Sequence, residues 1–349
     1  IIGATRNNNL GVAGIAGGNG DISDFRKGVS LYDVKIASTN SFTGNAILVN
    51  ASEAADAFVY AALDVSSFVP SSDFFTSELL GIGVDFINAS FGERTGSGGG
   101  FDNYRLMKDG VWFAWLNDVA IVAARGNDGL TRSYEEYLPA TMRDDRVICV
   151  AASGNDGLFK KDGNGNIADA ADNAYQSEYG LGVDLIAPGS NDNVTTTWNK
   201  NNSSYSGFNG TSAAVPHVVG VGSLIKDYYE SNPPFGVLYP YDIERLIELS
   251  AKPITFDPAG PDFYSSDYVG AGLLDAGNAL AIIEAPFYQV LHAPLGSPSV
   301  VTVLLIDDDF IVEVSGDELS APKDKYRAQV YKVEHTYTHT QSDPFVTIL

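Results

Sequence analysis

Four short, almost wholly apolar runs most constrain how this 349-residue chain can fold. Strands that are buried on both faces of a parallel sheet have this composition. The stretches between the runs include segments with apolar residues at helical spacing, such as Ala51 to Leu63 and Tyr104 to Leu116. The pattern continues to about residue 283 and predicts an α/β domain with a mostly parallel sheet covered by helices. The four runs are Val84–Ile87, Val119–Ala124, Val147–Ala152 and Val183–Ala187.

Two further segments carry strand patterns. Leu31 to Ile36 alternates apolar and polar residues, which predicts a fifth strand of the domain. From Pro286 to Leu349, strand-like runs alternate with Gly, Pro and Asp turns, as in part of a β-sandwich. We therefore expect two regions, an α/β domain over residues 1–283 and a β-rich C-terminal segment over residues 284–349 that is incomplete at its end.

The composition excludes several classes of partner. The formal net charge of -23 opposes binding to nucleic acid and to anionic membranes, because both would repel the chain. No apolar run is long enough to span a bilayer. The single cysteine, Cys149, lies in an apolar run, where it is expected to act as an inert core residue, and no disulfide can form within the chain.

The stretch from Gly210 to His217, Gly-Thr-Ser-Ala-Ala-Val-Pro-His, separates a polar loop from an apolar helical run. Gly210 and Thr211 form a cap-like entry, so Ser212 is expected at the N-terminus of a helix. There its hydroxyl would lie beside free backbone N–H groups that can bind a developing oxyanion. Pro216 is expected in the first turn, where proline costs no intrahelical hydrogen bond. The alternative is an ordinary capping serine, the commoner fate of a Gly-Thr-Ser triplet.

All eight positions resemble the nucleophile motif of the subtilisin-like serine proteases, Gly-Thr-Ser-x-Ala-x-Pro-His. Ala213 and Val215 are less usual members of that motif, and both concern packing behind the serine. The resemblance implies a three-layer α/β/α domain and a secreted serine endopeptidase that acts on polypeptides. Ser212 would be its nucleophile. The family chemistry requires no cofactor, although a structural calcium ion is expected in many members.

A second match comes directly after the predicted strand that ends at Ala124. Arg125-Gly126-Asn127-Asp128-Gly129 resembles the family's oxyanion element, Ala-Gly-Asn-x-Gly, with Arg125 an unusual residue. By this resemblance Asn127 donates its side-chain N–H to the tetrahedral intermediate, alongside the backbone N–H of Ser212. A neutral amide suits this role because it offers a donor without being a competing base. On its own, Gly-Asn-Asp-Gly is a generic turn.

The resemblance also implies a substrate edge. Ser90, Phe91 and Gly92 would pair their main chain with an extended peptide, which demands little of the side chains. Ala124 and Gly126 are implied as further substrate contacts. Tyr137, which precedes Leu138-Pro139-Ala140, would partly fill the primary specificity pocket and disfavour bulky P1 side chains. A plain strand end before a flexible loop is the alternative for residues 90–92.

The general base is expected outside these residues. The segment from Ile2 to Ala16 resembles the stretch directly after the family's catalytic histidine motif, which places the catalytic Asp and His upstream of Ile1. His217 lies five residues beyond Ser212 and so on another face of the helix. The chain alone is therefore expected to be inactive. The rival hypothesis aligns Asn8 with the histidine and makes the protein a pseudoprotease that binds extended peptides.

Two loops have the oxygen-rich composition of calcium sites. In the family, the Asn-rich loop after the histidine motif often binds calcium, which makes Asn8, Leu10 and Val12 candidate ligands. The second loop, Asp162 to Asn166, begins like an EF-hand but lacks the expected glycine and glutamate, so a hairpin insertion is the favoured interpretation. Gly96 to Gly100 has no lysine after it, which argues against a phosphate-binding loop and a nucleotide-binding protein.

Overall fold

The protein is represented by a computed structural model. It describes residues 1–19, 28–36, 51–64, 81–94, 100–127, 137–142, 146–154, 177–189, 194–198, 201, 204–231, 238–254 and 269–284, and the strand residues 288–289, 300–305, 310–315 and 329–332.

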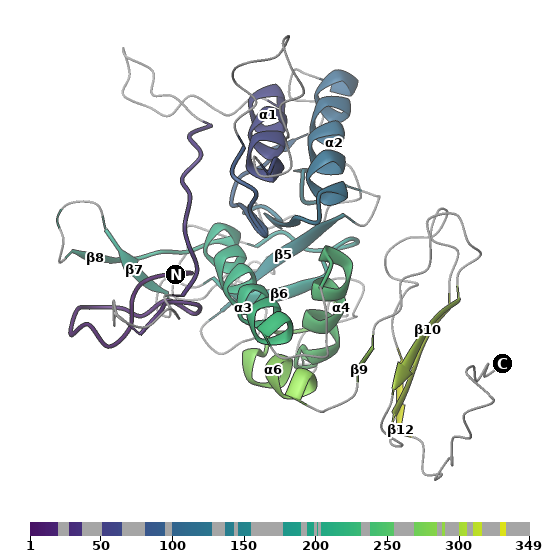
Figure 1. The fold of residues 1–349 in the computed structure, drawn as a ribbon. Coiled ribbons are helices and arrows are strands. Elements are labelled where there is room, and N and C mark those ends of the chain that lie inside the picture. Colours follow the sequence, from purple (N-terminus) through teal and green to yellow (C-terminus); the bar gives the residue numbers. More distant parts are fainter. Residues whose placement is uncertain are drawn as a thin grey trace, which may run out of the picture.

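A four-stranded parallel sheet forms the centre of the domain (Figure 1). Its order is β1-β3-β5-β6, with Ile121 of β3 paired both to Ile87 of β1 and to Val147 of β5. The four apolar runs of the sequence supply these strands, as predicted. Their bounds are Phe86–Ala89 for β1, Ala120–Ala124 for β3, Val147–Ser153 for β5 and Leu185–Pro188 for β6.

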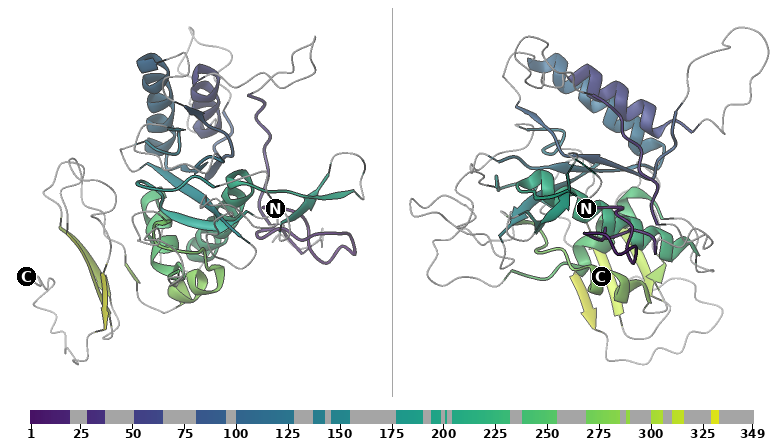
Figure 2. Two further views of the ribbon diagram at one scale, coloured as in Figure 1. Left: turned by 180° about the vertical axis from the view of Figure 1, so that it is seen from behind. Right: turned by 90° about the vertical axis from the view of Figure 1, so that its left-hand side faces the viewer.

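Helices cover both faces of this sheet, which gives the three-layer arrangement (Figures 1 and 2). The helices α1 (Ala51–Ala62) and α2 (Gly100–Leu116) pack on one face. The helices α3 (Thr211–Ser231), α4 (Pro240–Ser250) and α6 (Ala276–Glu284) pack on the other. The predicted helices are thus confirmed, although α2 begins before the expected Tyr104.

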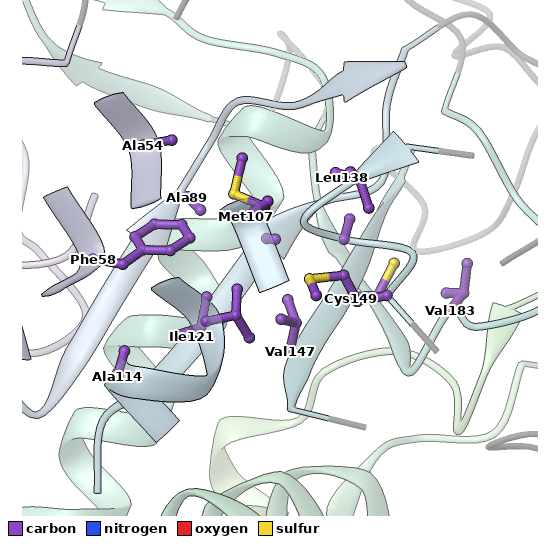
Figure 3. Packing of buried hydrophobic residues seen from close by; sticks show 14 of the residues in the cluster. Ala54, Phe58, Ala89, Met107, Ala114, Ile121, Leu138, Val147, Cys149 and Val183 are labelled. Carbon is purple, nitrogen blue, oxygen red and sulfur yellow. The ribbon is translucent and has the colours of Figure 1, made fainter. Parts of the chain in front are cut away.

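Side chains on the two faces of the sheet belong to two separate hydrophobic cores. Along β5, Val147 and Cys149 face α1 and α2, whereas Ile148 and Val150 face α3 and its neighbours. Figure 3 shows the first core, where Phe58 of α1 lies near Met107 and Ile121. Cys149 is fully buried in this core, which confirms its expected packing role. Burial on both sides explains why these strands are continuously apolar.

Three smaller sheets complete the described strands. Strand β2 (Glu93–Arg94) pairs with β4 (Tyr137–Leu138), and β7 (Thr195–Thr197) forms a hairpin with β8 (Tyr205–Gly207). The described C-terminal strands form an antiparallel sheet. None of the described helices combines the length and hydrophobicity that a membrane crossing needs. The C-terminal strands are β9 (Tyr288–Gln289), β10 (Val300–Leu305), β11 (Phe310–Ser315) and β12 (Gln329–Lys332).

The predicted strand from Leu31 to Ile36 is wrong. The segment has no strand hydrogen bonding, and Leu31 and Tyr32 are both 64% exposed. Alternation favours a half-buried strand only where a partner supplies main-chain bonds and a core accepts the apolar face. Among the described residues, neither is present for this segment. The Asp162 to Asn166 loop and the histidines at 292, 335 and 339 lie outside the described residues.

Candidate active site

The candidate site lies at the carboxyl edge of the parallel sheet, where α/β proteins commonly bind ligands. Helix α3 begins there, and the amide of Gly210 donates to the carbonyl of Gly189 just after β6 (2.8 Å). Ser212 is the second residue of α3 and is half-buried. The expectation that Ser212 stands at a helix N-terminus is therefore confirmed.

Asn127 lies against the start of α3. Its side-chain oxygen accepts from the backbone N–H of Thr211 (2.8 Å) and from the Thr211 hydroxyl (3.0 Å). Because a backbone N–H can only donate, this contact fixes which amide atom is the oxygen. A Cβ on Gly210, whose φ is +86°, would lie 2.9 Å from that oxygen, so glycine permits the close approach.

Two N–H donors remain beside Ser212 after these bonds are counted. The amides of Ala213 and Ala214 donate to the carbonyl of Gly210, and the amide of Thr211 donates to Asn127. Within the described part of the chain, the N–H of Ser212 and the Nδ2 of Asn127 have no hydrogen-bond acceptor. The site thus presents two unused donors next to the serine.

The Ser212 hydroxyl and carbonyl both contact Ser90. The hydroxyl donates to the carbonyl of Ser90 (3.1 Å), and the Ser90 hydroxyl donates to the carbonyl of Ser212 (3.0 Å). Asn88 in turn donates from Nδ2 to the Ser90 hydroxyl (2.8 Å). The end of β1 is therefore tied directly to the first turn of α3.

Pro216 explains why the Ser90 hydroxyl donates to the carbonyl of Ser212. It is the sixth residue of α3, beyond the first turn, so the position predicted for it is wrong. A proline there removes the N–H that would reach the carbonyl four residues back, which belongs to Ser212. The Ser90 hydroxyl supplies the missing donor.

The remaining predicted substrate residues gather around the same edge. Ala124 ends β3, Gly126 precedes Asn127, and Phe91 and Gly92 come after Ser90. The ring of Tyr137 lies on the backbone of Gly92, because a Cβ added to Gly92 would come 2.0 Å from Cε1 of that ring. Strand pairing between β2 and β4 holds Tyr137 in this place, and the Leu138-Pro139 peptide bond is cis.

His217 is not placed to act as a base on Ser212. Its Nδ1 donates to the carbonyl of Ala213 (2.8 Å), so the ring is held along α3. Burial lowers the pKa of His217, and the hydrogen bond to Ala213 opposes this effect. This contact supports the expectation that the motif histidine is structural.

The predicted metal loop curls around a hollow of about 340 Å³ lined by residues 5–13. Asn8 accepts the amide of Leu10 through Oδ1 (3.0 Å), and Asn7 and Asn9 both have φ of 60°. The Tyr205 ring lies over Gly11, whose added Cβ would come 1.8 Å from Cζ. The loop therefore rests on the β7–β8 hairpin, a contact that no local sequence pattern indicates.

One other group of acidic residues is compact enough to consider as a metal site among the described residues. Oxygens of Asp184, Glu244 and Glu248 lie within 4.8 Å of one another. Existing partners serve two of them: Cys149 N donates to Asp184 (2.6 Å), and Arg245 pairs with Glu248 (3.3 Å). We therefore describe this cluster as a structural one.

Sequence reasoning missed Thr211 and Glu178. Thr211 is fully buried, accepts the amide of Gly126 (3.2 Å) and orients Asn127. Glu178 is fully buried against Gly126. Thr211 lies inside the nucleophile motif, and the unusual Arg125 was the available signal for Glu178, because a buried arginine requires a buried counter-charge.

Comparison with known proteins identifies the family of this chain. A model of the subtilase family matches residues 10–272. The chain is similar to the extracellular protease of Xanthomonas campestris pv. campestris, with 28% identity over 234 residues, 66% of this chain and 32% of that protein. It is 33% identical to subtilisin DY of Bacillus licheniformis over 147 residues, 42% of this chain and 44% of that protein. The chain thus spans less than half of either relative.

The chain was also compared with solved structures. A protease from Pseudoalteromonas arctica PAMC 21717 is 27% identical, with a TM-score of 0.46, and the similarity covers 67% of this chain and 59% of that one. The class defined by fold and site is an α/β protein with a serine and an amide at the carboxyl edge of its sheet. Within that class, the chain belongs to the subtilase family of serine proteases.

Proposed function

We propose that this chain carries the nucleophile and the oxyanion hole of a secreted subtilisin-type serine endopeptidase. Ser212 Oγ attacks the scissile carbonyl and passes its proton to a histidine base held by an aspartate. The C–N bond then breaks as that histidine protonates the leaving amine, and water hydrolyses the acyl-enzyme. Among the described residues the one histidine, His217, is bonded along α3 to Ala213, so the described part of the chain does not supply this base and we expect the chain alone to be inactive.

One observation carries the proposal: the two unused N–H donors beside Ser212. The bonds from Thr211 turn the oxygen of Asn127 toward α3, which leaves Nδ2 for an oxyanion together with the Ser212 amide. Preorganised donors of this kind stabilise the charge that develops in the transition state. The Xanthomonas relative, which is named an extracellular protease, supports the secreted location.

The test compares variants of the active, full-length protease. We expect Ser212→Ala to abolish both peptide hydrolysis and labelling by a fluorophosphonate. Asn127→Leu should lower kcat on the order of 100- to 1000-fold with little change in KM, a magnitude that comes from subtilisin itself. The chain of 349 residues on its own should not label. Peptide binding without labelling in the folded full-length protein would instead identify a pseudoprotease.

The same proposal includes a small primary specificity pocket. The Tyr137 ring covers Gly92 beside the Ser90 edge, so it occupies space that a large P1 side chain would need. We therefore assign small P1 residues such as Ala to this protease. Extended peptides would pair with the main chain of residues 90–92.

We also include a structural calcium ion in the loop of residues 5–13. The hollow is lined by one continuous loop rich in amide and carbonyl oxygens, and Asn8, Leu10 and Val12 would supply ligands. Hard oxygen donors on a sharply turning loop are the type that calcium prefers. The ion would stiffen the loop and takes no part in the chemistry.

A further inference from the structure

Arg125 and Glu178 carry opposite charges and are buried next to Gly126 and Asn127. We call residues 125–127 the oxyanion turn. Both have 0% exposure, although arginine and glutamate are rarely buried completely. Burying an isolated charge is very costly, so two complementary charges in one region compensate each other. Arg125 comes just before Gly126 and Asn127 in the chain, and Glu178 packs against Gly126. Both charges therefore lie next to the proposed oxyanion donor.

Hydrogen bonds to main-chain carbonyls connect the segment around Arg125 with the segment around Glu178. Arg125 donates from Nη2 to the carbonyl of Tyr179 (3.1 Å) and more distantly to that of Leu181 (3.4 Å). In return, the amide of Glu178 donates to the carbonyl of Gly126 (2.9 Å). The segment from Glu178 to Leu181 is therefore fastened to the oxyanion turn at two points.

The Glu178 carboxylate also fixes the shape of Gly126. A Cβ on Gly126 would lie 2.7 Å from both Cδ and Oε2 of Glu178, so the carboxylate packs on the Cα atom itself. Gly126 has a φ of +120°, a conformation that other residues rarely adopt. A larger residue at position 126 would therefore have to displace the buried carboxylate as well as adopt an unfavourable φ.

On its other side, the turn is held by Thr211. The amide of Gly126 donates to the Thr211 hydroxyl, and that hydroxyl donates to Asn127. Thr211 therefore contacts Asn127 directly, whereas Arg125 and Glu178 contact the residues next to it in the chain or in space. A shift of the Arg125 or Glu178 side would move the Gly126 amide and, through Thr211, the amide of Asn127.

We propose that Arg125 and Glu178 are positioning residues that act as a unit to hold the Asn127 amide in its oxyanion-binding orientation. The inference rests on the proposed function. Stability alone does not account for the two buried charges, because buried charged groups of opposite sign can commonly be replaced together by apolar residues with little or no loss of stability. Precise placement of a catalytic donor does account for them, since small displacements in an active site have large effects on rate.

The experiment measures kcat and KM of the full-length protease with a peptide substrate. We expect Arg125→Met and Glu178→Gln each to lower kcat by about 10- to 100-fold with KM changed less than about threefold. Arg125→Lys should recover only part of the rate, because an ammonium does not reproduce the rigid, planar guanidinium whose Nη2 reaches two carbonyls. The apolar double variant Arg125→Met/Glu178→Leu keeps the site filled without charge and should fold, yet show a similar loss of kcat.

A double-mutant cycle with Asn127→Leu separates positioning from general damage. If the pair acts through Asn127, Glu178→Gln should lower kcat by less than about twofold once Asn127 is already leucine. Arg146→Met is the matched control. Arg146 stacks on Trp112 and Trp115 just before β5. It lies at the opposite end of the parallel strands from Asn127, which follows β3, so its loss should leave kcat unchanged.

The outcomes distinguish the inference from the function on which it rests. Full activity of Asn127→Leu or Ser212→Ala would overturn the proposed function itself. A large effect of Asn127→Leu together with an unchanged kcat in the folded double variant would overturn the positioning role alone. Equal losses from Glu178→Gln in both backgrounds of the cycle would also overturn it.

Discussion

At the residue scale, Ser90 completes a helix that a proline has interrupted. Pro216 leaves the carbonyl of Ser212 without its intrahelical donor, and the Ser90 hydroxyl takes that place (3.0 Å). We expect Ser90→Ala to lower the free energy of unfolding by about 1 kcal/mol, because a half-buried carbonyl loses its hydrogen bond. Urea denaturation of the folded chain measures this change.

The proline provides its own control for this prediction. In a Pro216→Ala background, the new backbone N–H can reach the Ser212 carbonyl, so Ser90→Ala should then cost less than about 0.5 kcal/mol. The same cost in both backgrounds would show that the Ser90 hydroxyl does not substitute for the missing helix bond.

Tyr137 is the second residue whose contacts carry a prediction. Removing its ring with Tyr137→Ala should raise kcat/KM for substrates with Phe at P1 by about 10-fold or more, since apolar pocket contacts of this size have such effects. Substrates with Ala at P1 should not gain. Tyr137→Phe keeps the ring over Gly92 and should retain the preference of the parent enzyme. An unchanged ratio of Phe to Ala hydrolysis in Tyr137→Ala would refute the small pocket.

Sequence reasoning singled out Ser212 and Asn127, which the structure brings to the same helix start, because each lies in a short local motif. It could not find that Ser90 serves the Ser212 carbonyl, since the two residues are 122 positions apart. Nor could it find that Thr211 orients Asn127 across 84 positions. These bonds depend on how elements meet in space, which a single sequence does not encode locally. The expectation for Pro216 failed because, in a helix that begins at Thr211, Pro216 is the sixth residue and lies beyond the first turn.

At the element scale, burial decided which predicted strands formed. The continuous apolar runs became β1, β3, β5 and β6 within a few residues, because a strand buried on both faces has few alternatives. The alternating segment from Leu31 to Ile36 did not form a strand. Alternation shows which face is apolar but does not show which strand will pair with it.

The β7–β8 hairpin makes the contact that holds the loop of residues 5–13. The Tyr205 ring lies on Gly11 although it is itself 37% exposed. We expect Tyr205→Ala to increase amide hydrogen exchange in residues 5–13 by about tenfold, because the loop loses its apolar support. Tyr205→Phe keeps the ring and should exchange like the parent.

Tyr60 offers a matched control on another element. It is a comparably exposed tyrosine on α1, with 44% exposure. Tyr60→Ala should leave exchange in residues 5–13 unchanged. A rise in exchange spread evenly over α3 and the sheet after Tyr205→Ala would indicate global destabilisation and would contradict a local supporting role for the hairpin.

At the scale of the whole molecule, the charge of -23 complicates any test for calcium. Self-repulsion destabilises a compact chain of high net charge, and any added cation screens it. A specific ion that binds only the folded state instead stabilises by mass action, by about 2.7 kcal/mol at one hundred times its Kd. Comparing different salts at equal ionic strength distinguishes screening from specific calcium binding.

We therefore expect millimolar calcium to raise Tm by several degrees more than sodium chloride or magnesium at equal ionic strength. Magnesium is the stringent comparison, because it has the same charge but demands a smaller octahedral site. Asn8→Ala removes one side-chain oxygen from the loop of residues 5–13 and should abolish the calcium-specific part while leaving the salt-dependent part intact. Equal stabilisation by all three salts would assign the whole effect to screening of the acidic surface, and a calcium effect that survives Asn8→Ala would place the ion elsewhere.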